Sequence, residues 1–539
     1  MSKEKPREIE LTLEEIEALR ERLRRENLLK PDYGLLDAIV VNYFVFEQGY
    51  QEQGHTLRRM ARLIFGPRTE KAREVFKGSS PEQPIPPSVE KPENQPPTEK
   101  ARGHGRNGAS SYQGAERIYV PHPDYKAGDP CPLCSNGNGK LYRLQEPAVV
   151  VRVRGRSPLE AKIYDVEKLR CHLCGKIVTA PLPEEAGQNK YDETAGAMVA
   201  LLKYGSGLPF NRLEKLQESL GLPLPASTQW EIVEKTADKI HPAYSELIRQ
   251  AAQSELLYND DTTMKILASL QKAEGEAIGD DENSRKGSFT TGVLAVREEY
   301  RTALFFTGPK HAGENITEIL KQRASDLKPP IQMCDALSRN LPKGFVTVLA
   351  NCLAHARRNF VDLVPSFPEE CRVVIEHLAK VYHHDEETKK QALSAEQRLR
   401  FHQDQSGPVM GKLKEWLKQQ INERRVEPNS SMGKAIAYMF NHWEPLTLFL
   451  RVPGAPLDNS LCEQILKRAI QHRKNSLFFR TQHGAFIGDL FMSLIHTCAL
   501  NRINPFHYLV TLQKHSSELF KNPGQWLPWN YHQAAMNPA

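Results

Sequence analysis

The stretch LLYNDDTTMKIL, from Leu256 to Leu267, places two adjacent acids directly after an apolar run. The run predicts a buried strand, and Asp260 and Asp261 stand where that strand is expected to end. Two neighbouring carboxylates repel each other, so their position next to a buried strand requires a compensating positive charge. A divalent cation supplies that charge, and oxygen ligands of this kind suit magnesium or manganese.

The segments after this stretch predict an alternation of strands and helices. Three strands are expected in LLYND, KGSFTTGVLAV and YRTALFFTG, followed by a helix in AGENITEILKQRAS. PPIQMCDAL predicts a strand that ends at Asp335, and FVTVL with AHARRNFVDLV predicts a further strand and helix. This order suits a ribonuclease-H-like α/β core. In that fold the ends of the first and fourth strands are neighbours, so Asp260 and Asp335 are expected to converge.

A third acid is expected in APLDNSLCEQILKRAIQHRKN. Pro456 and Asp458, a candidate cap, begin a predicted helix whose apolar positions are Leu461, Cys462, Ile465, Leu466 and Ala469. At about 100° per residue, Glu463, Lys467 and Lys474 lie within roughly 40° of one another, at the edge of the apolar stripe. A carboxylate between two lysines can hold a metal while the ammonium groups hold phosphates. An ordinary surface pair of Glu463 and Lys467 is the alternative, and the helix taken alone favours it.

Four of the nine cysteines form two CxxC pairs, and the other five are scattered along the chain. The pairs are Cys131 with Cys134 in CPLC and Cys171 with Cys174 in CHLC. Two such pairs complete a tetrahedral zinc shell with no open position for water, so a structural zinc in a small β-ribbon is expected. Two unrelated turns with free thiols are the alternative. A redox role is disfavoured because neither pair begins a helix in a βαβ pattern.

Length and composition predict a multidomain α+β protein. A chain of 539 residues exceeds what one hydrophobic core usually holds, and a proline- and glycine-rich stretch at 78–118 predicts a disordered linker. The expected segments are a helical N-terminal region at 1–77, the linker at 78–118, the zinc ribbon at 119–181, a helical segment at 182–250, the first part of the catalytic core at 251–365, a helical insertion at 366–455, the final core helices at 456–510 and a tail at 511–539.

Two predicted helical segments allow either a specific function, such as chain pairing or DNA binding, or ordinary packing within a domain. In the first, Thr12 and Glu15 can form a capping box before an apolar stripe, which suits either a short coiled coil or a helix packed on its own domain. In the second, KYGSGLPFNRLEKLQESLGLPLPASTQWEIVEKTA resembles a helix-turn-helix, with Ser227 or Thr228 capping the second helix. Many helical hairpins share this outline without contacting DNA.

Charge and hydropathy favour a soluble protein. The net charge of +6, from 72 basic and 66 acidic residues, permits nucleic-acid binding without requiring it. The longest apolar run, LLDAIVVNYFVF, is interrupted by Asp37 and Asn42 and is too short to span a bilayer. The cysteine pattern suits a reducing compartment. A cytoplasmic protein without membrane association is therefore expected.

The segment CLAHARRNF contains further candidates. Cys352 and His355 resemble a CxxH pair, but two ligands leave a zinc site incomplete, so a packed thiol and a hydrogen-bonding imidazole are favoured. Arg357 and Arg358 are candidates for phosphate contacts, and a solvated helix face is the alternative.

The ordered motifs NDDTT, QMCDALSRN, CLAHARRNF and DNSLCEQILKRAIQHRKNSLFF resemble the insertion-sequence 66 family of bacterial DDE transposases. LIFGPRTEK, the CxxC segment and KYGSGLPFNRLEKLQ extend the resemblance through most of the chain. The resemblance implies that Asp260, Asp335 and Glu463 are the catalytic acids and hold two magnesium or manganese ions. Asp261 stands where the family usually has glutamate, and we interpret it as a residue that supports the site without binding metal.

The resemblance also implies an activity and partners. It implies a DNA transposase of a bacterial insertion sequence that cuts at transposon ends and transfers the strands to target DNA. Transposon-end DNA, target DNA, further copies of the chain and accessory proteins of the element are the expected partners, at the bacterial nucleoid. A nuclease of the same fold that only hydrolyses DNA and a non-catalytic DNA-binding protein derived from a transposase are the alternatives.

Overall fold

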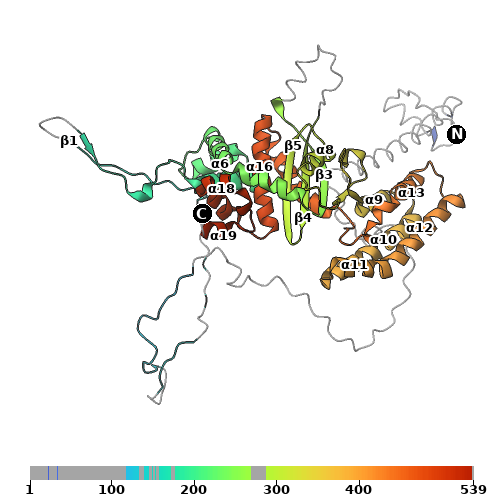
Figure 1. Ribbon diagram of the computed structural model, residues 1–539, viewed down its shortest axis with the longest axis horizontal. Coiled ribbons are helices and arrows are strands. Elements are labelled where there is room, and N and C mark those ends of the chain that lie inside the picture. Colours follow the sequence, from blue (N-terminus) through green and yellow to red (C-terminus); the bar gives the residue numbers. More distant parts are fainter. Residues whose placement is uncertain are drawn as a thin grey trace, which may run out of the picture. The chain divides into compact units, whose positions relative to one another are not determined.

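The computed structural model describes residues 22–23, 33, 117–132, 139–144, 149, 152, 157–170, 177–268 and 287–536 (Figure 1). The chain forms two compact units. One includes Ala350–Asp458, and the other consists of Glu82–Leu349 and Asn459–Ala539. The predicted helical region 1–77 and linker 78–118 lie almost entirely outside the described residues.

A five-stranded mixed sheet contains the strands that the sequence predicts. Its members are β3 (Leu256–Met264), β4 (Ser288–Arg297), β5 (Tyr300–Gly308), β6 (Ile331–Cys334) and β7 (Val348–Asn351). The strand order is β5-β4-β3-β6-β7. β3, β4 and β5 form an antiparallel meander, whereas β6 runs parallel to β3. The architecture is therefore a mixed sheet with helices, as an α/β core requires.

The first of these strands extends further than predicted. Asp260 and Asp261 lie inside β3 and not at its end, because antiparallel pairing with β4 continues past them to Met264. Thr262 and Thr263 favour this continuation, since β-branched side chains suit an extended backbone. The pairing of β3 with β6 ends before the two acids.

The helices of the sheet-containing unit are η2 (Glu184–Ala186), α4 (Glu193–Ala200), η3 (Leu201–Gly205), α5 (Phe210–Ser219), α6 (Ala226–Ala252), α8 (Ala312–Leu320), η4 (Ser338–Asn340), α15 (Ser460–Ser476), α16 (Gln482–Leu500), α17 (Pro505–Lys514), α18 (Ser516–Lys521), η7 (Pro523–Gln525) and α19 (Tyr531–Met536). The predicted cap of α6 is wrong. Ser227 and Thr228 lie inside this helix, which begins directly after Pro225, whose backbone is extended. α6 is 27 residues long and packs on α16 and the sheet, so it serves as a core helix.

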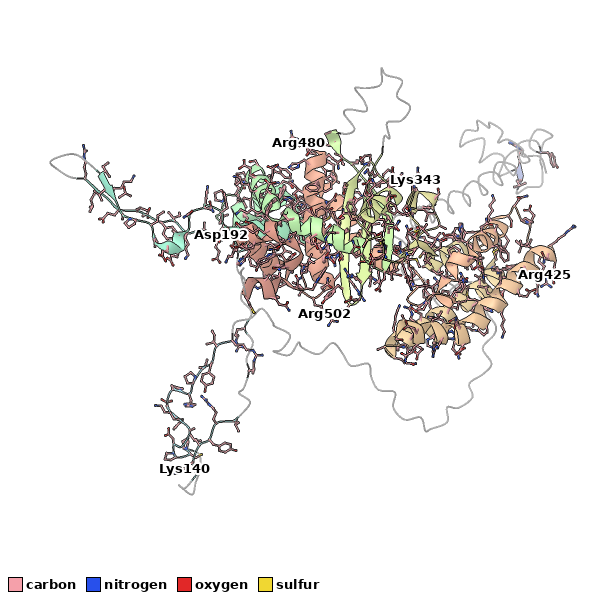
Figure 2. The ribbon with its side chains drawn as sticks, viewed as in Figure 1. Lys140, Asp192, Lys343, Arg425, Arg480 and Arg502 are labelled. Atoms are coloured by element: carbon pink, nitrogen blue, oxygen red, sulfur yellow. The ribbon has the colours of Figure 1, made fainter. Side chains whose placement is uncertain are left out.

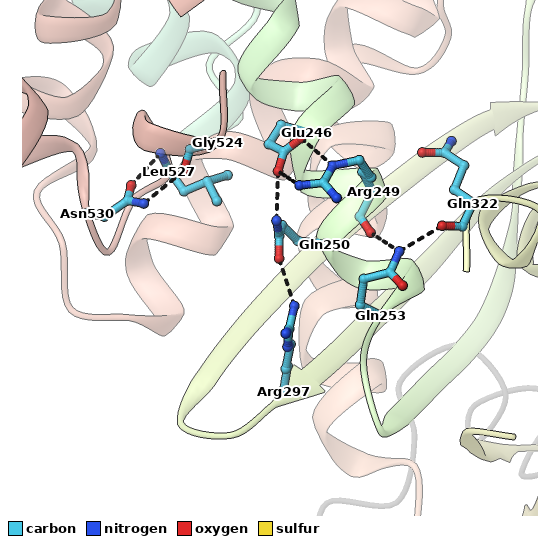
Figure 3. Close-up of polar contacts among 9 residues, drawn as sticks. All are labelled: Glu246, Arg249, Gln250, Gln253, Arg297, Gln322, Gly524, Leu527 and Asn530. Carbon is cyan, nitrogen blue, oxygen red and sulfur yellow. Dashed lines mark hydrogen bonds and ion pairs between the residues drawn. The ribbon is translucent and has the colours of Figure 1, made fainter. Parts of the chain in front are cut away.

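The C-terminal end of α6 is tied to other segments by side-chain amides (Figure 3). Gln250 donates a hydrogen bond to Glu246 within the helix and accepts one from Arg297 at the end of β4. Gln253 donates to the carbonyl of Gln322, which follows α8. These bonds hold the sheet and α8 at defined positions along α6.

Helix α16 lies beside the edge strand β5 (Figure 1) and satisfies its backbone with side chains. The bonds join Asp489 to the Thr307 N–H at 2.6 Å, Ser493 to the Phe305 N–H at 3.0 Å, Thr497 to the Ala303 N–H at 3.0 Å, and Asn501 to the Arg301 N–H at 3.2 Å. Four residues of helix rise about 6 Å and two residues of strand about 7 Å, so the two spacings match. These side chains replace a sixth strand and protect the edge from pairing with another chain.

Among the described helices, α16 is long and apolar enough by composition to cross a membrane. Within its most apolar window, 78% of the residues are buried inside the protein. Its length and apolar character are therefore those of a core helix packed on a sheet.

The Asp489 carboxyl is expected to make stability depend on pH. Asp489 is 4% exposed, and burial raises its pKa to about 7, although hydrogen bonds from Thr307 oppose the shift. Between about pH 4 and 7 the folded protein then binds one more proton than the unfolded chain, so stability from this group falls as pH rises. Asp489→Asn keeps the shape and removes a slope of about 1.4 kcal/mol per pH unit. In urea denaturation, the free energy of unfolding of the variant should rise relative to that of the wild type as pH rises. A difference that is equal at all pH values would contradict this.

The last segment of the chain is folded as far as Met536. Leu519, Trp526 and Tyr531 are each at most 2% exposed. Leu519 lies in α18, Trp526 directly follows η7 and Tyr531 begins α19. These elements follow α17, and α18 and η7 pack on α6. The predicted tail 511–539 is therefore a packed helical region as far as Met536, because its large apolar side chains are buried against the rest of the unit.

The described part of the other unit is helical. It contains α9 (Leu353–Val361), α10 (Pro368–Lys390), α11 (Ala395–Phe401), η5 (His402–Ser406), α12 (Gly407–Asn422), α13 (Ser431–Asn441), α14 (Trp443–Leu446) and η6 (Leu448–Leu450). Asp385 joins three of these elements through Lys389 at 2.7 Å, Arg398 at 2.5 Å and His402 at 3.3 Å. Although burial opposes them, these partners hold the pKa of Asp385 well below its usual value. Cys352 is buried.

The predicted zinc ribbon is described only in part. β1 (Lys168–Arg170) and β2 (Ile177–Thr179) form a two-stranded antiparallel sheet. Cys131 donates its N–H to the Gly139 carbonyl at 2.8 Å. The other three predicted ligands, Cys134, Cys171 and Cys174, lie outside the described residues. The zinc site remains a prediction.

Candidate active site

Asp260 and Asp261 point to opposite faces of β3, because successive side chains of a strand alternate. Asp261 lies on the face next to α8. One of its oxygens accepts a hydrogen bond from the Thr291 hydroxyl at 2.6 Å. The other accepts from the Ala312 N–H at 3.0 Å and lies 3.1 Å from His311 Nδ1. Both oxygens are therefore occupied by protein groups, and the N-terminal end of α8 stabilises the negative charge.

Asp260 lies on the face next to α15. Its cross-strand partner is Gly292, and the Cys462 thiol of α15 donates to the Gly292 carbonyl at 3.4 Å. A Cβ at Gly292 would lie 3.1 Å from Leu466 Cδ1, so the missing side chain lets α15 approach the sheet closely. Glu463 follows Cys462 in the first turn of α15. This close approach brings Glu463 toward Asp260.

Asp335 follows directly after β6, which is the parallel neighbour of β3. The register of the two strands pairs Tyr258 with Met333. Asp260 and Asp335 each lie two residues further along, beyond the last paired residues of the two parallel strands. Two acids that are far apart in the sequence therefore lie just beyond the same end of one paired stretch, and their convergence remains a prediction.

The Cys462 thiol is buried where α15 contacts β4. Burial raises its pKa well above the usual value for cysteine, and four carboxylates raise it further, those of Asp260, Glu463, Asp335 and Asp261. Acids of β3, of the residue that follows β6 and of α15 therefore act electrostatically on one buried thiol.

Sequence reasoning missed the buried amides beside these acids. Asn259 donates to the Asn340 carbonyl at 3.1 Å and accepts from Gln332 at 2.8 Å. Asn459 donates to the Asn259 carbonyl at 3.1 Å. These bonds join β3, β6, the loop after β6 and the start of α15. The available signal was proximity in sequence, because Asn259 directly precedes Asp260.

The predicted cap of α15 falls one residue too early. The helix begins at Ser460, so Asn459 and not Asp458 precedes it. The Asn459 side chain makes no bond to the helix N-terminus, because it reaches across to β3 instead. Asn459 therefore ties the start of α15 to β3, the strand of Asp260, and does not cap the helix.

The basic residues predicted to contact DNA lie in two different units. Lys467 and Lys474 are exposed on α15. Arg357 and Arg358 belong to α9 in the other unit. Arg357 is 7% exposed, which does not favour a phosphate contact. Arg358 is half-buried and lies 3.4 Å from His355 Nε2.

The sequence profile described as "Transposase IS66 family" matches residues 189–486, which is more than half of the chain. The protein belongs to this family. The matched span of this IS66-family chain contains β3, β6 and α15, and with them Asp260, Asp335 and Glu463. The partly described segment with the CxxC pairs lies outside it.

Two relatives of this IS66-family protein come from Sinorhizobium fredii (strain NBRC 101917 / NGR234). Uncharacterized protein y4jD is 25% identical over 451 residues, which cover 81% of this chain and 86% of the relative. Uncharacterized protein y4hP is 26% identical over 444 residues, which cover 78% of this chain and 76% of the relative. The likeness therefore extends beyond the span matched by the family profile.

Proposed function

We propose that this IS66-family protein is the DNA transposase of a bacterial insertion sequence, which cuts at transposon ends and joins the cut strands to target DNA. Asp260, Asp335 and Glu463 are its proposed catalytic acids. The observation that carries the proposal is the close approach of α15, the helix of Glu463, to the sheet at Gly292, which is the cross-strand partner of Asp260. The strand order and directions of the sheet support a ribonuclease-H-like core.

The donor set suits two magnesium or manganese ions, because it consists of carboxylate oxygens gathered at one face of a sheet. Asp260, Asp335 and Glu463 would hold these ions. When bound, such ions activate the attacking oxygen and stabilise the leaving oxygen of an in-line displacement. Asp261 holds no metal in this proposal, because both of its oxygens already accept hydrogen bonds from the protein.

The same acids serve both chemical steps. In the first, water attacks the phosphodiester at the transposon end and the leaving strand keeps a 3′ hydroxyl. In the second, this hydroxyl attacks a phosphodiester of the target, so one phosphodiester forms as another breaks. Lys467 and Lys474, exposed on the helix of Glu463, bind the phosphates near the reacting bond. The buried amides and Gly292 keep β3, β6 and α15 at a fixed separation during both steps.

The test is incubation of the full chain with labelled DNA from the ends of the element, a target plasmid and magnesium. The expected products are ends cut to a 3′ hydroxyl and plasmid joined to the labelled strand. Omitting the divalent ion should remove both. Cutting without joining would identify a nuclease that only hydrolyses DNA, and binding without cutting would identify a non-catalytic DNA-binding protein.

Asp261→Asn is expected to reduce cleavage about tenfold to a hundredfold, as second-layer residues of metal sites do. Asparagine offers one acceptor to donors that now share two carboxylate oxygens, so stability should fall by about 1–3 kcal/mol. Single-turnover cleavage and urea denaturation measure the two effects. Thr291→Val is the matched control, because it removes one donor to Asp261 and leaves the charge in place. A cleavage defect as large as that of Asp260→Asn would contradict the assigned role.

The remaining predictions stay part of this proposal. Cys131, Cys134, Cys171 and Cys174 hold a structural zinc in the segment 119–181. That segment and the helices of 182–250 bind DNA, and the helical insertion 366–455 covers the DNA ends between the two parts of the core, 251–365 and 456–510. Arg357 and Arg358 are the weaker phosphate candidates. The protein works in the bacterial cytoplasm as a homo-oligomer on DNA, with accessory proteins of the element.

A further inference from the structure

Two large apolar side chains are exposed in the loop that follows α15. Leu477 is 64% exposed and Phe478 is 42% exposed. Leu477 also has a φ of 65°, in the left-handed region that residues with a side chain seldom adopt. Strain of this kind persists only where the surrounding structure imposes it, and it concentrates at functional sites.

The loop is held firmly on both sides. The Phe479 N–H donates to the Lys265 carbonyl at 2.9 Å, and the Phe479 carbonyl accepts from the Leu267 N–H at 3.0 Å. The buried Phe479 ring stacks on His472, with ring centroids 5.1 Å apart. Arg473 donates to two threonine hydroxyls of β3, at 3.1 and 2.7 Å. The exposure of the two apolar side chains is therefore a fixed feature of a rigid loop.

Basic side chains surround this loop. Lys265, Lys474 and Arg480 are exposed, and none of them forms an ion pair with another described residue. Arg480 lies on the outer surface in Figure 2. Positive charge beside exposed apolar side chains matches duplex DNA, because the charges bind phosphates and the apolar groups can enter between base pairs. An acidic protein surface could also pair with these charges, but it would not need apolar side chains of this shape beside them.

We propose that Leu477 and Phe478 form a wedge that enters the base stack of the transposon-end DNA. This inference rests on the proposed function. β3 and its continuation run from Asp260 to Ile266, which pairs with Phe479. At 3.3 Å per residue this run spans about 20 Å. For DNA that lies along this face, with about 3.4 Å per base pair, the wedge acts about six base pairs from the cut.

The test uses the full chain and a duplex from the end of the element, with 2-aminopurine placed at successive positions. Calcium replaces magnesium so that no strand is cut. The wild type is expected to raise the fluorescence several-fold at one or two adjacent positions, about six base pairs from the cut, because unstacked 2-aminopurine is bright. Phe478→Ala should remove this rise. Phe520→Ala is the matched control, since Phe520 is 53% exposed on α18.

Leu477→Gly separates a role in DNA distortion from a role in folding. Glycine adopts positive φ without strain, so the variant should melt at the same or a higher temperature and still lose the fluorescence rise. A protein that cuts the DNA in magnesium but brightens no position would overturn the wedge alone. A protein that neither binds nor cuts would overturn the proposed function first. A changed oligomeric state in Phe478→Ala, with unchanged fluorescence, would assign the loop to a protein interface instead.

Discussion

Asp260→Asn, Asp335→Asn and Glu463→Gln are each expected to lower cleavage and strand transfer by about a thousandfold or more, with DNA binding nearly unchanged. Each variant keeps the side-chain volume and removes one charge that holds metal. Losing any one should resemble losing all three, because residues that act as a unit are strongly non-additive. Single-turnover cleavage of labelled transposon-end DNA measures the first effect, and filter binding of the same DNA measures the second.

Asp326→Asn is the control for this series. Asp326 is an exposed carboxylate between α8 and β6, so its neutral form should cleave like the wild type. Normal cleavage by all three site variants would refute the proposed mechanism. Loss of cleavage in Asp261→Asn with normal cleavage in Asp260→Asn would show that the first acid is assigned one residue too early.

Gly313→Ala is expected to destabilise the protein by about 3 kcal/mol. A Cβ at this position in the first turn of α8 would lie 2.2 Å from the Leu341 carbonyl oxygen and 2.8 Å from that of Arg339. Backbone atoms cannot rotate away as the tip of a side chain can, so α8 and the loop after β6 must separate. That loop continues from Asp335 and the start of α8 holds Asp261, so cleavage should fall as well.

Urea denaturation of Gly313→Ala measures this loss of stability, and Gly411→Ala supplies the contrast. Gly411 lies inside α12, and a Cβ there would meet nothing within 4 Å. Alanine at such a position should stabilise the helix by about 0.5–1 kcal/mol. Equal urea midpoints for Gly313→Ala and the wild type would show that the loop after β6 can move away from α8 at little cost in stability.

The sequence by itself determined the local elements around the site and the acids that they carry. Alternating or continuous apolar runs predicted β4, β5 and β6, and helical spacing predicted α8 and α15. Such elements can be predicted from the sequence because the apolar residues of one helix or strand recur with its period and pack on one surface. The order of the strands also led to the expected convergence of Asp260 and Asp335, which the parallel register of β3 and β6 supports. The stripe of α15 at Cys462, Ile465 and Leu466 is buried as predicted.

Only the tertiary structure decided where each element ends and what its polar residues contact. β3 passes beyond Asp260 and Asp261 because β4 pairs with it. The side chains of these two acids point to opposite faces of β3, so Asp260 is a metal-site candidate and Asp261 is bonded to α8. Asp489, Ser493 and Thr497 recur every four residues in an apolar helix, and only the position of β5 shows that they bind its backbone N–H groups. Each of these features depends on a partner distant in sequence, and the free energy of a buried polar group is set by that partner, so no local pattern contains it.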